Sequence, residues 1–164
     1  PDNVYALSRL AQEKLLDFLC GQAGGRAVHL RYCHANDQKR GHLRRMADAI
    51  QGEISLGPAP DQKVQVIGLH DFVRCTALAG AGGASMPDVV NVAHPRVWTH
   101  RELAERIRSE LGCGRVIYDR ETGGVEDSVW ANTNRMIEGF GPPEADLEDL
   151  IGRVIAAAKV DYRP

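Results

Sequence analysis

Short apolar runs alternate along this chain with segments that carry apolar residues at helical spacing, and this alternation limits the possible folds more than any other feature. The short runs are residues 27–32, 64–67, 88–93 and 116–119, and the helical segments are residues 10–20, 43–50, 72–79, 103–111 and 147–155. Each short run has the length of one strand, and glycine or proline lies at most of the junctions. The pattern predicts an α/β fold in which helices separate the strands of a parallel sheet.

Polar residues at the helix ends support these boundaries. Thr99 and Glu102 form a predicted capping box, and Gly112 follows the last apolar residue of that helix. Asp71 and Asp146 are predicted N-caps of two further helices. The glycine-rich stretch 80–83 follows a helix and precedes no clear one, so we interpret it as a loop and not as a phosphate-binding turn.

Composition narrows the class of protein. The chain has 164 residues, 43% hydrophobic and 26% charged, which suits one globular unit with a buried core. Its formal net charge of -2 gives no overall attraction to nucleic acid or to an anionic membrane. No apolar run approaches the roughly 20 residues that cross a bilayer, and no signal-peptide pattern is present, so we expect a cytoplasmic protein. The four cysteines form no Cys-x-x-Cys pair, which predicts reduced thiols and no metal site.

Tyr5 and Arg9 are the first candidate functional residues. They are four residues apart at the start of the first helical segment, so they lie on one helix face. A positive charge beside a phenol favours the phenolate, which would make Tyr5 a usable proton donor and acceptor. The alternative is a purely structural pair at a helix start. The same helix carries a predicted apolar stripe of Leu7, Ala11, Leu15 and Phe18.

Several motifs, in order, resemble the extended short-chain dehydrogenases/reductases that act as nucleotide-sugar epimerases, dehydratases and reductases. The segment 5–9 resembles the family's Tyr-x-x-x-Lys, and 31–36 resembles the start of its Arg-Tyr-Phe-Asn-Val-Tyr-Gly-Pro strand. Segments 67–73, 91–104 and 131–143 are similar to later family motifs, so the resemblance covers about residues 1 to 158. Two substitutions depart from the family pattern: Arg9 stands in place of lysine and His34 in place of asparagine.

The resemblance implies the C-terminal part of a Rossmann-like parallel sheet plus a small α/β substrate-binding lobe. Residues 1–35 would end the dinucleotide-binding domain, and residues 36–164 would mostly form the substrate-binding lobe, with 64–80 returning to the nucleotide domain. The family's glycine motif and its Ser/Thr, which lie upstream of the tyrosine, have no counterpart here. We therefore expect a C-terminal half that is inactive without its missing N-terminal half, and a homodimer is possible in the complete protein.

The resemblance also assigns functional roles. Tyr5 would be the acid/base and Arg9 its electrostatic partner, both binding NAD or NADP, while His34 and Arg120 would contact a sugar nucleotide. Arg44 is a further candidate substrate contact because of its charge, not because of the resemblance. The implied activity is that of an NAD(P)-dependent epimerase, dehydratase or reductase. The alternative is a non-catalytic relative that binds a nucleotide or a protein partner.

Two further interpretations come from the residues themselves. The basic stretch Lys39, Arg40, Arg44 and Arg45 could bind a diphosphate or form a solvated helix face. Trp98 and His100 are interpreted as packing and surface residues.

Overall fold

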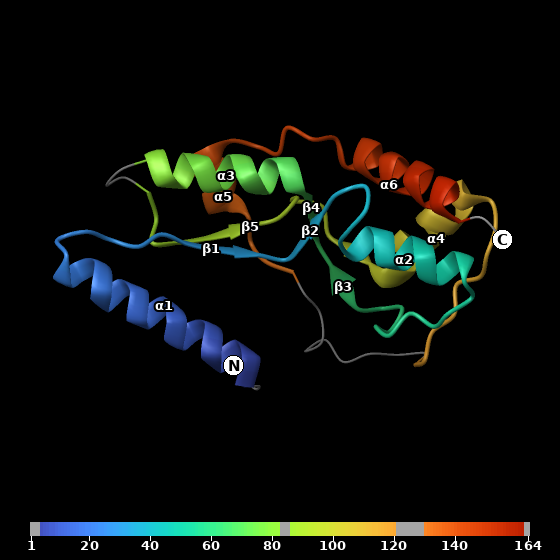
Figure 1. Cartoon of the computed structure of the whole chain (residues 1–164), viewed down its shortest axis with the longest axis horizontal. Coiled ribbons are helices and arrows are strands. Elements are labelled where there is room, and N and C mark those ends of the chain that lie inside the picture. The colour runs from blue at the N-terminus through green and yellow to red at the C-terminus, as the bar shows by residue number, and fades with distance from the viewer. Residues whose placement is uncertain (1–3, 83–85, 121–129, 163–164) are drawn as a thin grey trace.

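The computed structural model describes residues 4–82, 86–120 and 130–162, and Figure 1 shows the arrangement of its elements. The helices are α1 (Val4–Gln22), α2 (His42–Gln51), α3 (Leu69–Ala81), α4 (His100–Leu111), α5 (Asn134–Phe140) and α6 (Leu147–Asp161). The strands are β1 (His29–Tyr32), β2 (His34–Asn36), β3 (Lys63–Val64), β4 (Val66–Gly68), β5 (Val89–Val92) and β6 (Trp98–Thr99). This mixed order confirms the predicted α/β class.

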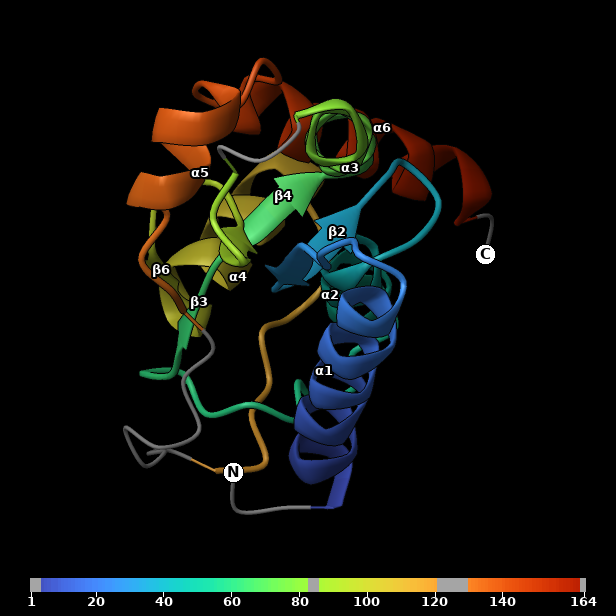
Figure 2. The same ribbon diagram turned by 90° about the vertical axis from the view of Figure 1, so that its left-hand side faces the viewer.

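The strands pair mainly in parallel. β1 pairs with β5 from His29 opposite Val89 to Tyr32 opposite Val92. β2 follows β1 after a single residue and pairs in parallel with β4. The short pair β3 and β6 is antiparallel, so the expectation of parallel strands is wrong for this pair. Figure 2 shows α3 and α6 on one side of β2 and β4, with α1 on the opposite side.

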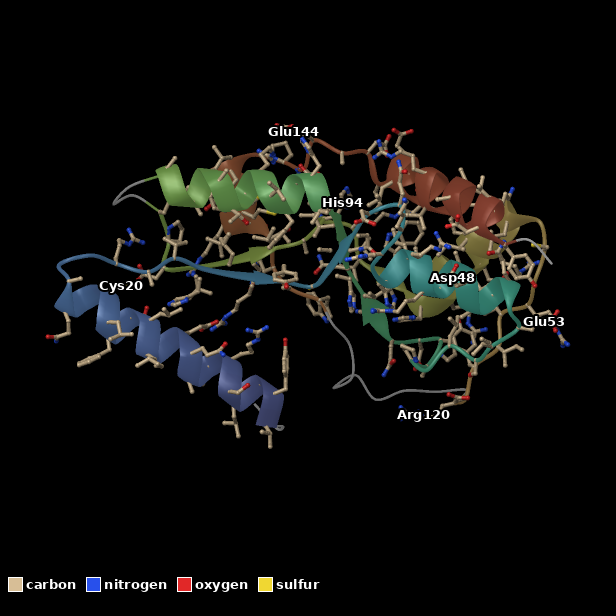
Figure 3. All side chains as sticks on the ribbon, viewed as in Figure 1. Cys20, Asp48, Glu53, His94, Arg120 and Glu144 are labelled. Carbon is tan, nitrogen blue, oxygen red and sulfur yellow. The ribbon has the colours of Figure 1, made fainter. Side chains whose placement is uncertain are left out.

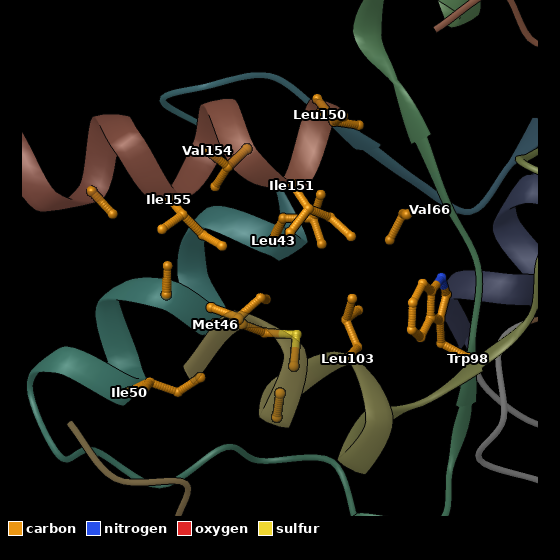
Figure 4. Close-up of a cluster of buried hydrophobic side chains, with 14 of the residues drawn as sticks. Leu43, Met46, Ile50, Val66, Trp98, Leu103, Leu150, Ile151, Val154 and Ile155 are labelled. Atoms are coloured by element: carbon orange, nitrogen blue, oxygen red, sulfur yellow. The ribbon is translucent and has the colours of Figure 1, made fainter. Parts of the chain in front are cut away.

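One hydrophobic core lies where α2, α4 and α6 meet. Figure 4 shows Met46 of α2, Leu103 of α4 and Ile151 of α6 directed toward one another. All three are nearly or completely buried, and Trp98 closes one end of the cluster. The helical spacing in the sequence therefore identifies the buried faces of these three helices correctly.

A second core joins β1 and β5 to the helices α3 and α5. Its buried members are Ile67, Cys75, Val90, Val92, Met136 and Phe140. Strand β5 and helix α5 thus pack with β1 and α3, and not with the cluster of α2, α4 and α6. The expected division into 1–35 and 36–164, with 64–80 returning, stays a prediction.

Capping residues define both ends of α4 and the starts of α2 and α6. Thr99 accepts a hydrogen bond from the Glu102 amide while Glu102 reaches back to the Thr99 amide, which confirms the predicted capping box. Gly112 ends α4 with φ 72°, a left-handed conformation that glycine adopts without steric cost. Asp146 caps α6 as predicted. The start of α2 is capped from outside the helix, because buried Asn36 of β2 accepts from the Leu43 amide.

Three sequence predictions are wrong in detail. Asp71 is not the N-cap of α3, since Gly68 occupies that position and Asp71 lies in the first turn with a buried side chain. The predicted strand at 116–119 forms only one isolated parallel bridge, between Tyr118 and Leu56. Residues 80 and 81 belong to α3 instead of to a loop, while residue 83 lies outside the described residues.

The predicted apolar stripe on α1 faces away from the rest of the described structure. Leu7, Leu15 and Phe18 are all exposed, and no described residue of α1 is buried. The reason is the orientation of the helix: its opposite face, which carries Glu13 and Asp17, contacts β1 through polar groups. Residues two positions apart lie about 200° apart around a helix, so polar contacts at 13 and 17 turn positions 11 and 15 outward.

Candidate functional site

The phenol of Tyr5 and the guanidinium of Arg9 are in direct contact on α1. Arg9 Nε donates to the Tyr5 hydroxyl at 3.3 Å, and the guanidinium carbon lies 5.3 Å from the ring centroid. The hydrogen bond and charge of the Tyr5 oxygen raise the pKa of Arg9 above its ordinary value. Tyr5 is 68% exposed, which leaves its hydroxyl open to a ligand. The geometry expected from the spacing is therefore present.

A cavity of about 520 Å³ lies between this helix face and β1. Arg31 of β1 forms two hydrogen bonds with Glu13, at 2.8 and 2.6 Å, and His29 contacts Asp17 at 2.7 Å. The bond from Arg31 lowers the pKa of Glu13, and the one from His29 lowers the pKa of Asp17. These polar contacts hold α1 along the strand, so that Tyr5 lines the cavity together with residues at the carboxyl end of β1.

A second cavity, of about 440 Å³, is lined by three histidines from three elements. His34 of β2 stacks on His42 of α2, with ring centroids 4.4 Å apart and an angle of 17° between the planes. His42 in turn meets the edge of His100 of α4 at 4.8 Å and 87°. Arg45 of α2 and Lys63 of β3 line the same cavity. We refer to this space as the histidine cavity.

The histidine rings are neutral near pH 7. Burial lowers the pKa of His42 to about 3 and that of His100 to about 4, and the neighbouring imidazoles add to the effect. Burial and the charge of Arg45 also lower the pKa of His34. His42 Nε2, His100 Nδ1 and the Ser55 hydroxyl are buried without a hydrogen-bond partner among the described residues. A buried polar atom without a hydrogen bond lowers the stability of the fold, so these atoms are candidates for contacts with a ligand.

The two cavities adjoin at the junction of β1 and β2. Cys33 lines the cavity of Tyr5, and the next residue, His34, lines the histidine cavity. Because successive side chains of an extended chain point to opposite sides, this short segment contributes one side chain to each cavity.

The other predicted substrate contacts lie elsewhere. Arg44 is 13% exposed and pairs with Asp48 at 2.7 Å and with Asp161 at 2.9 Å, so its guanidinium joins α2 to the end of α6. Arg120 is exposed, follows the bridge at Tyr118 and lines neither cavity (Figure 3). Their roles as substrate contacts stay predictions.

Sequence reasoning missed His42, His100 and Lys63 as lining residues, and considered Arg45 only as part of a basic stretch. His100 is buried, so its interpretation as a surface residue is wrong, whereas Trp98 packs in the core as expected. His34, His42 and His100 are half of the six histidines in the chain, but their spacing does not mark a site. Their meeting depends on tertiary packing, which no local pattern reveals.

The described residues contain no group of three or more His, Cys, Asp or Glu side chains arranged to hold a metal ion, so the three histidines are not a metal centre in this geometry. Within the same described ranges, no helix has the length and apolar character needed to cross a membrane.

Comparisons with known proteins rest on structure alone, because no protein-family model and no curated protein sequence matches the chain. The UDP-N-acetylglucosamine 4-epimerase of Methanobrevibacter ruminantium M1 has a TM-score of 0.80 at 19% identity, over 99% of this chain and 55% of that one. The UDP-glucose 4-epimerase of Thermotoga maritima has a TM-score of 0.76 at 16% identity, over 96% and 53%. RMD from Pseudomonas aeruginosa, complexed with NADPH, has a TM-score of 0.73 at 18% identity, over 99% and 57%.

The chain has the fold of about half of such an epimerase. The two epimerases belong to the extended short-chain dehydrogenase/reductase type that the motifs resemble, and identities below 20% establish the shared fold alone. The chain spans just over half the length of the structures it matches. This coverage agrees with the predicted C-terminal part of a Rossmann-like fold.

Proposed function

We propose that this chain is the C-terminal half of an NAD(P)-dependent enzyme that acts on a hydroxyl or ketone of a sugar nucleotide, as an epimerase, dehydratase or reductase. One observation carries the proposal: in an epimerase-like fold, the consecutive residues Cys33 and His34 line the cavity of Tyr5 and Arg9 and the histidine cavity, respectively. The proton-transfer group lines the first cavity, and two permanent cations, Arg45 and Lys63, line the second. Cations of this kind form charge-assisted hydrogen bonds with a diphosphate.

Tyr5 would exchange a proton with the substrate oxygen. Arg9, which already donates to that phenolic oxygen, would stabilise the phenolate left when the proton is given up. Arg9 is exposed and lies next to Tyr5, so it is also placed to bind the nicotinamide ribose, the role that the resemblance gives to the family's lysine. The cofactor, when bound, would accept and return a hydride.

The residues of this chain fit only one end of the cofactor. Tyr5 and Arg9 can hold the ribose, but no described junction of a strand and a helix carries the spaced glycines that bind a pyrophosphate. We therefore infer that a separate dinucleotide-binding half completes the site. The exposed apolar side chains of α1, among them Leu7, Leu15 and Phe18, would then have a partner surface.

A non-catalytic binding module is the second candidate, and the geometry of Arg9 favours it. Besides its bond to Tyr5, Arg9 donates from Nη1 to Gln12 Oε1 at 3.0 Å. Arginine is planar and longer than lysine, and it is not a neutral replacement at a close-fitting ribose site. If these contacts persist when cofactor is offered, the ribose would lack its cation.

The test is turnover of UDP-glucose and related sugar nucleotides by the complete gene product with NAD or NADP. Tyr5→Phe should abolish turnover and leave cofactor affinity nearly unchanged, because it removes a proton-transfer group and little else. Tyr162→Phe is the matched control, since Tyr162 is also an exposed tyrosine, at the end of α6. Full activity of the Tyr5→Phe enzyme would show that Tyr5 has no chemical role, and absence of turnover for every substrate would favour the binding module.

A further inference from the structure

His34 differs from the other two histidines of the cavity in its accessibility. His42 and His100 are buried residues, whereas His34 is only partly buried. The stack on His42, itself held by the edge of His100, fixes the plane of the His34 ring. His34 is therefore the histidine that a ligand reaches first, in an orientation that is set before the ligand arrives.

The charged groups around His34 are all basic. Arg45 of α2 and Lys63 of β3 line the cavity. The other titratable side chains that line it are the neutral rings of His42 on α2 and His100 on α4. No aspartate or glutamate is among the described residues that line the cavity. The described lining of the cavity thus contains two permanent cations and no carboxylate.

We propose that His34 binds the diphosphate of the substrate as an imidazolium ion that forms only when the substrate enters, and that the stacked His42 is the positioning residue for its ring. The inference rests on the proposed function, because it assigns the diphosphate of a sugar nucleotide to this cavity. It also explains why a histidine can stand where the resembling family has asparagine: a neutral side chain becomes a third cation beside Arg45 and Lys63.

The sign of the effect follows from the charges. In the free protein, burial and Arg45 hold the pKa of His34 below its ordinary value, so the ring is neutral at pH 7. A doubly charged diphosphate within a few ångströms favours the imidazolium and raises that pKa. His42, with a pKa of about 3, stays neutral because it is more deeply buried. Binding therefore takes up a proton, and affinity increases as the pH falls through the neutral range.

Isothermal titration calorimetry of the complete gene product with UDP-glucose tests this inference. UDP-glucose is a suitable probe because its pyrophosphate diester does not titrate in the neutral range. Titrations in buffers of different ionisation enthalpy should give an uptake of up to about one proton per ligand, and affinity should increase by up to about tenfold for each unit of pH lowered. Binding without proton exchange would overturn the inference and leave the proposed function standing. No binding at any pH would overturn both.

Variants separate charge from packing. His34→Asn restores the family's residue, so it should bind UDP-glucose with no proton uptake and with an affinity independent of pH. His42→Phe keeps a stacked ring and should keep the uptake, whereas His42→Ala should weaken binding and reduce the uptake. His70→Gln is the control, because His70 is exposed and lines a different cavity. Proton uptake that persists in His34→Asn, or equal behaviour of His42→Phe and His42→Ala, would contradict the assigned roles.

Discussion

Asp71 should be one of the most sensitive positions in the chain, although the sequence presents it as an ordinary helix cap. Its carboxylate is 1% exposed and accepts from the backbone amides of Glu144 at 2.8 Å and Ala145 at 3.0 Å. Arg74 contacts the same carboxylate at 3.4 Å and donates to the carbonyl of Phe140 at 2.7 Å. The cluster joins α3 to the segment between α5 and α6, which connects the two hydrophobic cores.

These contacts determine how much stability the protein should lose when Asp71 is replaced. A hydrogen bond to a charged group contributes about 1.5–3 kcal/mol, and removing the acceptor also leaves buried donors unpaired. Asp71→Ala should therefore lower the free energy of unfolding by about 3–5 kcal/mol. Asp71→Asn keeps one acceptor oxygen but places an NH2 group against an amide donor, so we expect a loss of about 1.5–3 kcal/mol.

Urea denaturation followed by circular dichroism measures the effect. The control is Asp149→Asn, which changes an acidic residue in the first turn of another helix, α6. Asp149 is 74% exposed and lies 3.9 Å from Arg153, so the substitution should change the unfolding free energy by less than about 0.5 kcal/mol. Equal effects of Asp71→Asn and Asp149→Asn would refute the reasoning that the buried carboxylate holds the two cores together.

Three further predictions follow. In the complete protein Arg9→Lys should preserve or raise turnover, whereas Arg9→Met should weaken cofactor affinity and turnover; unchanged steady-state kinetics and cofactor binding in Arg9→Met would remove its assigned role. Calorimetry of this chain alone should show weak or no NAD(H) or NADP(H) binding, because the glycine turn is absent from the described residues, and a micromolar dissociation constant would reveal an unrecognised site. The free energy of unfolding should fall as the pH drops from about 6.5 toward 5. The pKa values of His42 and His100 are lowered in the folded protein, so the unfolded chain binds more protons in this range, and each histidine contributes a slope of up to about 1.4 kcal/mol per pH unit. An unfolding free energy that does not change with pH in denaturant titrations would contradict this prediction.

The sequence predicts the helices well where an amphipathic pattern and a cap coincide. For α4, Thr99 and Glu102 define the start, Gly112 defines the end, and Leu103 and Ile107 identify the buried face. Both signals are local, and the structure contains both. The strands were harder to predict, because β3 and β6 have two residues each and their pairing is set by long-range contacts.

Asp71 and α1 show why local patterns fail. An aspartate at the start of a helix is typical of an N-cap. The carboxylate oxygens of Asp71, however, accept hydrogen bonds from backbone amides more than seventy residues away in the sequence. The stripe of α1 has the periodicity of a buried face, yet the polar contacts of Glu13 and Asp17 with β1 orient the opposite face toward the strand. In both cases the deciding partner lies far away in the sequence.

The candidate site could be predicted in part. Tyr5 and Arg9 are one helical turn apart, so spacing alone places their side chains together. His34 was identified through the resemblance to a family strand. The contributions of His42 and His100 could not be anticipated, because they come from two helices that meet only in the folded core.

We propose above that a sugar nucleotide binds in the histidine cavity. Amide and imidazole chemical shifts of the isotope-labelled chain, followed by NMR during titration with UDP-glucose, test it most directly. The account predicts shifts concentrated at His34, Arg45 and Lys63, with a smaller effect at Tyr5. It would be contradicted by unchanged spectra at millimolar UDP-glucose, or by shifts confined to the cavity lined by Lys39, Arg40 and His70 on another part of the surface.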